Sequence, residues 1–285
     1  MNKTKKILFP TDFSAPAANA FKYALRYADR TSSTIEVLHV VYPTGESIDF
    51  PGLATQMTQK AMDVERELLT NFITKGIEEV ADELEERPMI SRAMEIGGTV
   101  NAITRIAKRD EADLIIMGSR GTNRSRLEKM LGSIAEGVVA QSYCPVIIIP
   151  EDAKSKAPEK IAYATNVLDS DPYELWKSLQ LLEVFSCEIH LVHFNYKKSG
   201  NLKAFEELEN MFAFSQKQSP EIDFRMHNQF GDSLEDDLNK FIEKEGIDLL
   251  VMYQQEHSLW DRLMKTSATK KMALHTNVPL LILKK

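Results

Sequence analysis

The chain has 285 residues, 43% of them hydrophobic, and a formal net charge of −7 at pH 7. A general nucleic-acid coat protein needs a surplus of Lys and Arg, so this charge balance argues against that class. The length suits two domains, and no stretch approaches the ~20 apolar residues of a membrane helix, which argues against a membrane protein.

The cysteines and the N-terminus indicate the compartment. Cys144 and Cys187 form neither a disulfide framework nor a CxxC pair, a pattern that suits a reducing cytosol. The apolar run at residues 7–9 ends at Pro10, which makes it too short for the apolar segment of a signal peptide. We therefore do not expect a signal peptide at the N-terminus. We therefore expect a cytoplasmic protein.

Short apolar strands alternate with amphipathic helices through the first half of the chain. Strands are predicted at residues 7–9, 35–41, 89–94, 114–117 and 146–149, and helices at residues 17–28, 57–72, 100–107 and 134–141. This alternation predicts an α/β fold with a doubly wound, Rossmann-like parallel sheet that is covered by helices on both faces.

The pattern then restarts after a polar segment. Residues 151–160 carry Pro158 and lack apolar periodicity, which predicts a linker. The stretches that follow it echo earlier ones in the same order: IAYATNVLDSD echoes ILFPTDFSAPA, LVHFNY echoes VLHVVY, DLLVMYQQE echoes DLIIMGSRG, and NVPLLILKK echoes CPVIIIPED. Four ordered matches predict a tandem duplication, with domains at residues 1–150 and 161–285.

The most unusual residues of the first copy follow its strands. Pro10-Thr11-Asp12 follows the first strand, and MGSRGTNRSRLEKMLGS, residues 117–133, begins as the fourth strand ends. In a doubly wound sheet, ligands bind outside the carboxyl ends of the strands, where the strand order reverses. Glycines let backbone N–H groups approach oxyanions, and a helix N-terminus adds unsatisfied donors and partial positive charge. The predicted phosphate cradle comprises Gly118, Arg120, Gly121, Gly132 and Ser133.

Structural explanations of these residues stay open at this point. Ser133 to Glu136 has the capping-box pattern, which would by itself account for Ser133. Gly118 could simply end a strand, and the basic loop could be a solvated surface. Asp12 could cap the entry to the next helix or bind a ribose hydroxyl.

The stretches ILFPTDFS, LHVV, GSRG, the following GS, and CPVIII resemble the universal stress protein family. Both halves resemble it, so the chain is similar to the tandem members. ATP-binding members carry GxxG, nine residues, then G followed by S or T. The resemblance implies ATP or AMP as the ligand, with or without Mg²⁺. It also implies that Asp12 contacts the ribose, the Val40 backbone the adenine and Gly118 the nucleoside, with Gly121, Gly132 and Ser133 at the phosphates.

Two departures from the family pattern bear on binding. The spacer at residues 122–131 has ten residues, one more than the pattern, and could displace Gly121 from Gly132 by up to ~3 Å. The second copy departs further, with the following substitutions at the equivalent positions: Ala164 for Pro10, Asn166 for Asp12, Tyr253 for Gly118, Glu256 for Gly121, and Thr266-Ser267 for Gly132-Ser133. We expect this half to be a structural partner that does not bind nucleotide in the same way. In the family, partners associate through their last strands, which predicts that residues 146–149 and 278–283 pair across a pseudo-twofold axis.

Other chemistry has weaker support. No P-loop, HExxH, GxSxG or kinase motif is present, so we expect at most slow ATP hydrolysis and no dedicated enzyme. His190 and His193 lie three apart in a strand and should point to opposite faces, so no metal site is predicted from them. His39 and His193 occupy equivalent positions, which predicts a shared structural role. Core packing is the predicted role of Trp176, Met211, Phe212, Phe214, Met226 and Trp260.

The expected function is a cytoplasmic stress-response regulator that binds an adenine nucleotide in its first domain. The alternative is a nucleotide-independent interaction or chaperone-like protein, which the longer spacer and the altered second copy favour. An adenylating or ATP-hydrolysing enzyme is a third option. No nucleic-acid or membrane partner is expected, and whether two chains form a homodimer stays open.

Overall fold

The computed structural model describes residues 5–41, 51–119, 132–154, 156–165, 181, 187–195, 202–220, 222–231, 233–254 and 277–284. Within this part of the chain, no helix combines the length and the apolar run that crossing a bilayer requires.

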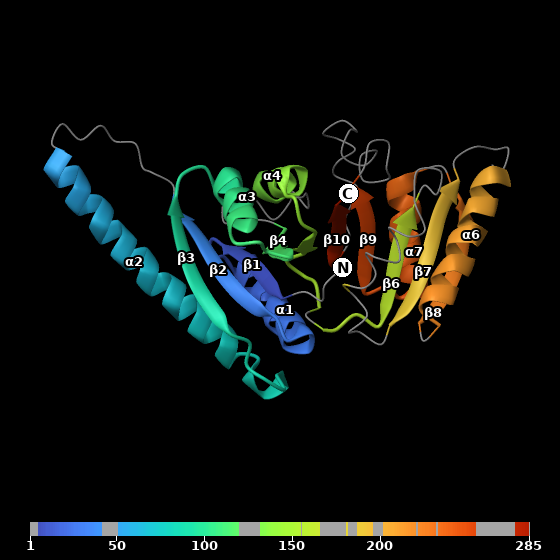
Figure 1. The fold of residues 1–285 in the computed structure, drawn as a ribbon, viewed down its shortest axis with the longest axis horizontal. Helices are drawn as coiled ribbons and strands as arrows, with labels where there is room; N and C mark the ends of the chain where they lie inside the picture. The colour runs from blue at the N-terminus through green and yellow to red at the C-terminus, as the bar shows by residue number, and fades with distance from the viewer. Residues whose placement is uncertain are drawn as a thin grey trace.

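One ten-stranded sheet passes through both halves of the chain, in the order β3-β2-β1-β4-β5-β10-β9-β6-β7-β8 (Figure 1). Its strands are β1 Lys6–Thr11, β2 Thr34–Val41, β3 Ile90–Ile96, β4 Leu114–Gly118, β5 Val146–Ile149, β6 Lys160–Thr165, β7 Glu188–Asn195, β8 Asp223–Phe230, β9 Leu249–Gln254 and β10 Leu280–Lys284. All neighbouring strands run parallel except β5 and β10, which run antiparallel. The predicted α/β fold with a mostly parallel sheet is therefore confirmed.

Helices cover both faces of the sheet. Their bounds are α1 Ala15–Thr31, α2 Pro51–Glu78, α3 Thr99–Arg109, α4 Ser133–Gln141, α6 Leu202–Gln218 and α7 Leu234–Glu245, with a short 3-10 helix, η1, at Ala81–Glu83. One hydrophobic core packs α1, α2 and α6 against the sheet, and the other packs α3, α4 and α7 against the opposite face. Successive side chains of a strand point to opposite faces of the sheet and so enter different cores. Phe9 of β1 packs in the first core and Leu8 in the second.

Aromatic packing and capping fix the first βα unit. Phe9 contacts Phe21 of α1, with ring centroids 5.1 Å apart. The side chain of Ser14 caps the N-terminus of α1 by accepting from the Ala17 N–H at 3.2 Å. The helix ends at Ser32, which adopts a left-handed conformation. These local signals direct α1 back across the sheet to begin β2.

Equivalent hydrogen bonds in the two halves confirm the tandem duplication. Asp113 Oδ2 accepts from the backbone N–H groups of Lys5 and Lys6, both at 2.9 Å. Asp248 Oδ2 accepts from the two corresponding N–H groups at the start of β6, at 3.1 and 3.2 Å. The second copy has the shorter helix before its third strand, since α2 has 28 residues and α6 has 17.

The last strands of the two halves pair with each other, as the family resemblance implied. β5 and β10 align antiparallel, with Leu281 opposite Ile147. Each strand would otherwise end its half of the sheet with unpaired backbone groups, and the pairing covers both edges. The halves therefore share one continuous sheet (Figure 1).

The segment between the halves is anchored to the first one. Asn19 Nδ2 donates to the carbonyl oxygens of Pro150, Glu151 and Ala153, at 3.4, 3.2 and 3.1 Å. β6 begins at Lys160, so the last residue assigned to the predicted linker belongs to a strand. The remaining described residues of the linker lie outside helices and strands.

Candidate functional site

The strand order reverses beside β1. From β1 the chain adds β2 and β3 on one side, whereas β4 and β5 lie on the other. β1 pairs with β2 along its whole length, from Lys6 to Thr11, but with β4 only at Ile7 and Leu8. The pairing of β1 with β4 thus stops before their carboxyl ends, where Pro10 has no N–H to donate. Ligands of doubly wound folds bind at such a switch point.

The turn after β1 holds Asp12 in place. Asp12 Oδ1 accepts hydrogen bonds from the N–H and the hydroxyl of Ser14, at 3.1 and 2.6 Å. Ser14, and not Asp12, is the N-cap of α1, so the interpretation of Asp12 as the helix cap is wrong. The Asp12 side chain is exposed. Its carboxylate is therefore oriented by the turn and accessible from solvent.

Phe13 connects this turn to β2. It has a φ of 62°, which is rare for a bulky side chain. Its ring stacks on the His39 ring, with centroids 4.3 Å apart, and its N–H donates to Thr11 Oγ1 at 3.0 Å. Such backbone strain persists where the surrounding contacts impose it, and it is often found at functional sites.

Val40 lies at the same edge of the sheet. His39 is paired with Thr11 in the β1–β2 register, so Val40 is level with Asp12. Nδ1 of His39 donates to the Thr11 carbonyl at 2.9 Å and fixes β2 against the end of β1. His193 makes the equivalent contact with the Thr165 carbonyl at 3.1 Å, which confirms the predicted shared role of the two histidines.

Gly118 ends β4 beside the first turn of α1. A Cβ at this position would lie 3.4 Å from the Pro16 carbonyl oxygen and 3.6 Å from the Ala17 nitrogen, which is ordinary contact or slightly closer. Packing alone therefore does not require glycine at position 118. The absence of a side chain leaves the backbone at the switch point uncovered, as a ligand in close contact would need.

Ser119 ties the end of β4 to the start of α4. Its N–H donates to the Ile149 carbonyl at 2.9 Å, and its own carbonyl accepts from the Gly132 N–H at 2.7 Å. The end of β4 at Gly118-Ser119 and the start of α4 at Gly132 therefore lie side by side. The Gly132 N–H is thus already bonded within the protein.

The N-cap residue of α4 has no side chain with which to cap the helix. Gly132 occupies the N-cap position, and Ser133 is the exposed first residue of the helix. The capping-box interpretation of Ser133 is therefore wrong. The first N–H groups of a helix have no acceptor within it and add partial positive charge, so this end of α4 suits an anion.

The structure thus brings Pro10, Thr11, Asp12, Val40, Gly118, Gly132 and Ser133 to one edge of the sheet. The following predicted positions lie outside the described residues: Arg120, Gly121, the spacer 122–131, Asn166, Trp176, Glu256, Trp260 and Thr266-Ser267. Sequence reasoning missed the structural roles of Phe13, Ser14 and Ser119. Only the N-cap had a sequence signal, since serine precedes Ala-Pro at the start of α1.

The equivalent edge of the second half is different. Tyr253 lies opposite Leu283 in the sheet, as Gly118 lies opposite Ile149. The Tyr253 ring is half-buried and packs against the hydrophobic core. A large side chain thus stands where the first half has none. Met211, Phe212 and Met226 also pack in or against that core, as predicted.

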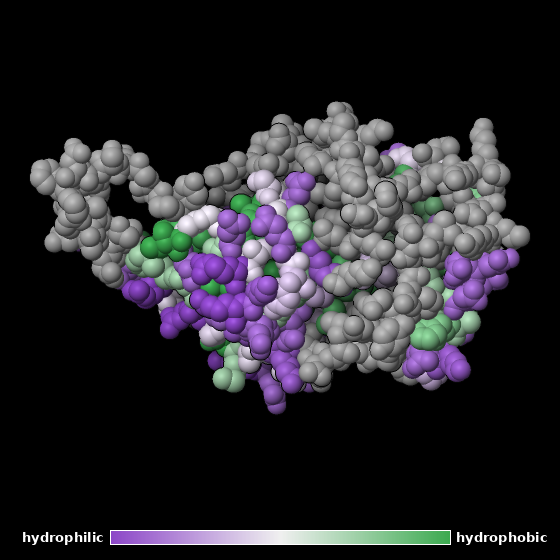
Figure 2. Space-filling view, turned by 45° about the horizontal axis from the view of Figure 1, so that its top comes forward, coloured by the Kyte–Doolittle hydropathy of each residue, from purple (hydrophilic) through white to green (hydrophobic). Residues whose placement is uncertain are grey.

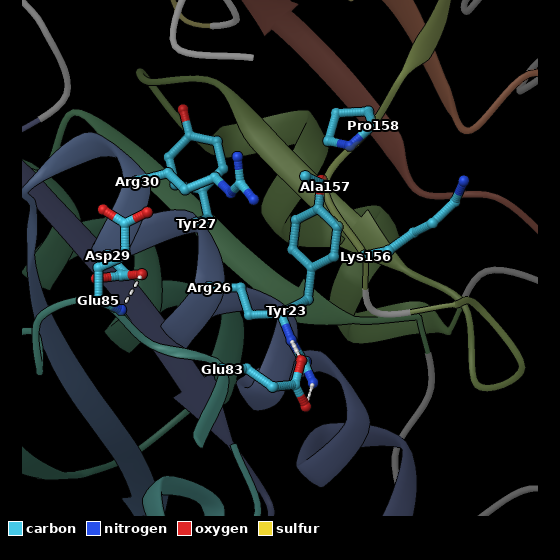
Figure 3. A pocket seen from close by; sticks show the side chains of 10 residues that line it. All are labelled: Tyr23, Arg26, Tyr27, Asp29, Arg30, Glu83, Glu85, Lys156, Ala157 and Pro158. Carbon is cyan, nitrogen blue, oxygen red and sulfur yellow. Dashed lines mark hydrogen bonds and ion pairs between the residues drawn. The ribbon is translucent and has the colours of Figure 1, made fainter. Parts of the chain in front are cut away.

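A separate hollow of about 210 Å³ lies along the C-terminal half of α1 (Figure 3). Glu83 accepts two hydrogen bonds from Arg26, at 2.8 and 2.7 Å, and the Asp29 carboxylate accepts from the N–H groups of Glu85 and Glu86. Lys156, from the linker, pairs with Asp248 at 3.1 Å. These charged groups are occupied in joining α1, the η1 region and the linker, so we assign this hollow a structural role.

Comparison with known proteins gives consistent matches. The model of the Universal stress protein family matches residues 3–150. Universal stress protein MJ0531 of Methanocaldococcus jannaschii is 31% identical over 155 residues, which cover 54% of this chain and 86% of that protein. Universal stress protein MJ0577 of the same archaeon is 30% identical over 153 residues, 51% of this chain and 94% of that protein. A crystal structure of a universal stress protein from Archaeoglobus fulgidus aligns with a TM-score of 0.68 at 21% identity, over 98% of this chain and 96% of that one. This last match extends the shared fold over both halves.

Proposed function

Since the chain belongs to the universal stress protein family, we propose that it is a cytoplasmic stress-response regulator whose first unit, residues 1–150, binds ATP or AMP. The observation that carries the proposal is the hydrogen bond between Ser119 and Gly132. It holds the N-terminus of α4, which begins at a glycine N-cap, beside the end of β4, the strand next to β1 and Asp12.

Each part of the nucleotide has a group of matching chemistry at this edge. The accessible carboxylate of Asp12 can accept hydrogen bonds from ribose hydroxyls. The backbone of Val40 offers an N–H and a carbonyl to the adenine edge, and the bare backbone of Gly118 admits the nucleoside. The first N–H groups of α4 and the Ser133 hydroxyl suit the phosphates, and we assign Arg120 and Gly121 to the same role by their position in the motif. Mg²⁺ would neutralise part of the phosphate charge when ATP is the ligand.

The second unit, residues 161–285, acts in this proposal as a structural partner. Tyr253 occupies the position of Gly118, and the sequence has Asn166 in place of Asp12. These changes place a bulky ring and an uncharged side chain where the first unit would hold the nucleoside. The pairing of β5 with β10 gives this unit a fixed position beside the first.

A path for reporting nucleotide occupancy follows from the same contacts. Ser119 donates to Ile149, the last residue of β5, and β5 pairs with β10 of the second unit. A phosphate that orders the turn at Ser119 and Gly132 would therefore also stiffen the junction between the units. Asp12 is the one carboxylate that this proposal assigns to the nucleotide, and it assigns no residue to align a nucleophile, so phosphoryl transfer would be slow at most.

The second candidate function is a nucleotide-independent interaction or chaperone-like role. The observation in its favour is a set of exposed hydrophobic side chains, among them Val64, Met89 and Phe230, which are 58%, 77% and 66% exposed. Chaperone-like binding needs a contiguous apolar surface. On the face shown in Figure 2, the described surface is mostly hydrophilic, with hydrophobic residues in small separate groups. The described residues of this face therefore form no large contiguous apolar surface.

The proposal is tested by nucleotide release and thermal stability. Purified protein that is denatured and filtered should release an adenine nucleotide detectable by mass spectrometry. Added ATP with Mg²⁺ at 100 times its Kd should stabilise the folded protein by about 2.7 kcal/mol. Ser133→Asp, which places a carboxylate at the phosphate end of the site, should abolish the shift in Tm, whereas the uncharged Ser133→Asn should keep most of it. An unchanged response in Ser133→Asp would contradict the assigned site.

A further inference from the structure

Two histidines and a glutamate converge in the second half, away from the edge described above. His190 on β7, His227 on β8 and Glu245 at the end of α7 each offer one ligand atom, and these atoms all lie within 4.8 Å of one another. Both imidazoles lie beside Phe241 of α7, whose ring centroid is 6.1 Å from that of His190 and 4.9 Å from that of His227. The three side chains therefore meet between the sheet and α7.

Two buried histidine nitrogens lack hydrogen-bond partners. His190 is fully buried; its Nε2 lies 2.7 Å from Glu188 Oε1, whereas its Nδ1 has no hydrogen-bond partner. Nε2 of His227 is also buried without a hydrogen-bond partner. A buried polar atom without a partner destabilises the folded protein, and a ligand at this place would satisfy both atoms.

We infer that His190, His227 and Glu245 bind a divalent transition-metal ion, with Zn²⁺ the best fit to this donor set. Two imidazoles and one carboxylate are a common zinc ligand set, with water in the fourth position. Mg²⁺ and Ca²⁺ prefer sites made of oxygen ligands, so they fit less well. Glu188 is then a positioning residue, because a carboxylate on the far nitrogen of a metal-binding histidine fixes the ring. Arg225 Nε holds Glu188 Oε1 at 2.6 Å.

Metal binding requires a small local rearrangement. Zn–N bonds of about 2.0–2.1 Å in a tetrahedral site place ligand atoms roughly 3.3 Å apart. The three ligand atoms here lie within 4.8 Å of one another, so binding would draw them together. The two imidazole rings are stacked, with an interplanar angle of 2°, whereas each must bind the ion in its own plane. The half-buried His227 ring would therefore have to rotate relative to the buried His190 ring. Lys244, 3.2 Å from Glu245 Oε1, is exposed and its weak pair can be displaced.

The site lies at the opposite end of the sheet from the proposed nucleotide site. His190 is near the start of β7, and Glu245 ends the helix that leads into the start of β9. The metal would join β7, β8 and α7 at the amino-terminal edge of the strands, whereas the nucleotide site uses carboxyl ends. Its role is therefore a structural staple of the second unit, and it does not depend on nucleotide binding.

Calorimetric titration of chelator-treated, full-length protein with ZnCl₂ tests this inference. We expect one Zn²⁺ site per chain and a rise in Tm, with no comparable response to MgCl₂. His227→Gln and Glu245→Gln should each weaken Zn²⁺ binding about 10-fold or more. The matched control is Glu243→Gln, an exposed carboxylate on the same helix, which should bind as the unchanged protein does. Equal affinity in all three variants, or no Zn²⁺ binding at all, would overturn the inference.

Two further measurements separate this site from thiol binding and from folding effects. Cys187 adjoins Glu188, so Cys187→Ser should retain Zn²⁺ binding, and X-ray absorption should show nitrogen and oxygen ligands without sulfur. Loss of binding in Cys187→Ser would contradict the assignment. Glu188→Gln should weaken binding about 10- to 100-fold while the ligand set in the absorption spectrum stays the same, as expected for a positioning residue.

Discussion

The imidazole of His39 donates through Nδ1 to the carbonyl oxygen of Thr11, at 2.9 Å, and joins the carboxyl ends of β2 and β1. The same relationship recurs between His193 and Thr165 in the second half. In the first half, Phe13 stacks on the His39 ring and connects this contact to the turn that carries Asp12. Both halves thus share the contact between a histidine and a threonine carbonyl. In the first half alone, this contact is connected to the proposed nucleotide site.

The two histidines should respond alike in stability and differently in binding. His39→Ala and His193→Ala each remove a buried hydrogen bond, which should destabilise the protein by about 1 kcal/mol or more. Only His39→Ala should weaken ATP binding, because only that ring supports the Asp12 turn. Thermal unfolding and ATP titration of both variants check this expectation. Equal ATP affinities in the two would contradict the link between His39 and the site.

Replacing Asp12 by Asn separates the structural role of this side chain from its charge. The amide oxygen can still accept from Ser14, so the Tm should change little. ATP affinity should fall roughly 10-fold, since hydrogen bonds to a charged acceptor are stronger by about 1–2 kcal/mol than those to a neutral one. Circular dichroism and ATP titration together test this. A large loss of Tm would instead indicate that Asp12 serves the turn alone.

Position 118 should tolerate a methyl group and not a ring. A Cβ there makes close but tolerable contact with Pro16, so Gly118→Ala should fold and keep ATP affinity within a few-fold. Gly118→Tyr copies the residue of the second half, Tyr253, and should abolish binding by covering the backbone. Thermal unfolding in the absence of nucleotide controls for misfolding. Retained ATP binding in a folded Gly118→Tyr variant would show that the nucleoside does not contact this strand end.

The two thiols should react slowly in the folded protein. Burial raises the pKa of both Cys144 and Cys187 to about 11, so at pH 8 the thiolate fraction is about 100-fold below that of a thiol with a pKa of 9.0. Alkylation by iodoacetamide should speed up about tenfold per pH unit up to pH 10, and should be fast in denaturant. Mass spectrometry over time measures both rates. Rapid alkylation of the folded protein at pH 8 would contradict the burial of these side chains.

Hydrophobic periodicity was sufficient to predict the order of the elements, because most strands and helices of the first half bury apolar side chains. β3 has no fully buried residue, and Val64 and Leu68 of α2 are exposed. The repeat identified β5 and β10 as equivalent last strands, and the family resemblance predicted that they pair. Details that depend on contacts between distant residues were not predictable. Gly132 takes the N-cap position in place of Ser133, and the Gly132 N–H donates to the Ser119 carbonyl. His190 and His227 meet only through the β7–β8 register, which single-strand patterns do not specify.

The stoichiometry of ATP binding tests the central proposal most directly. Calorimetric titration of nucleotide-free protein with ATP and Mg²⁺ should give one site per chain, and none in Ser133→Asp. Two sites per chain would contradict the assignment of the second unit as a structural partner. One site that persists in Ser133→Asp, or no binding by the unchanged protein, would contradict the proposed site at the ends of β1 and β4.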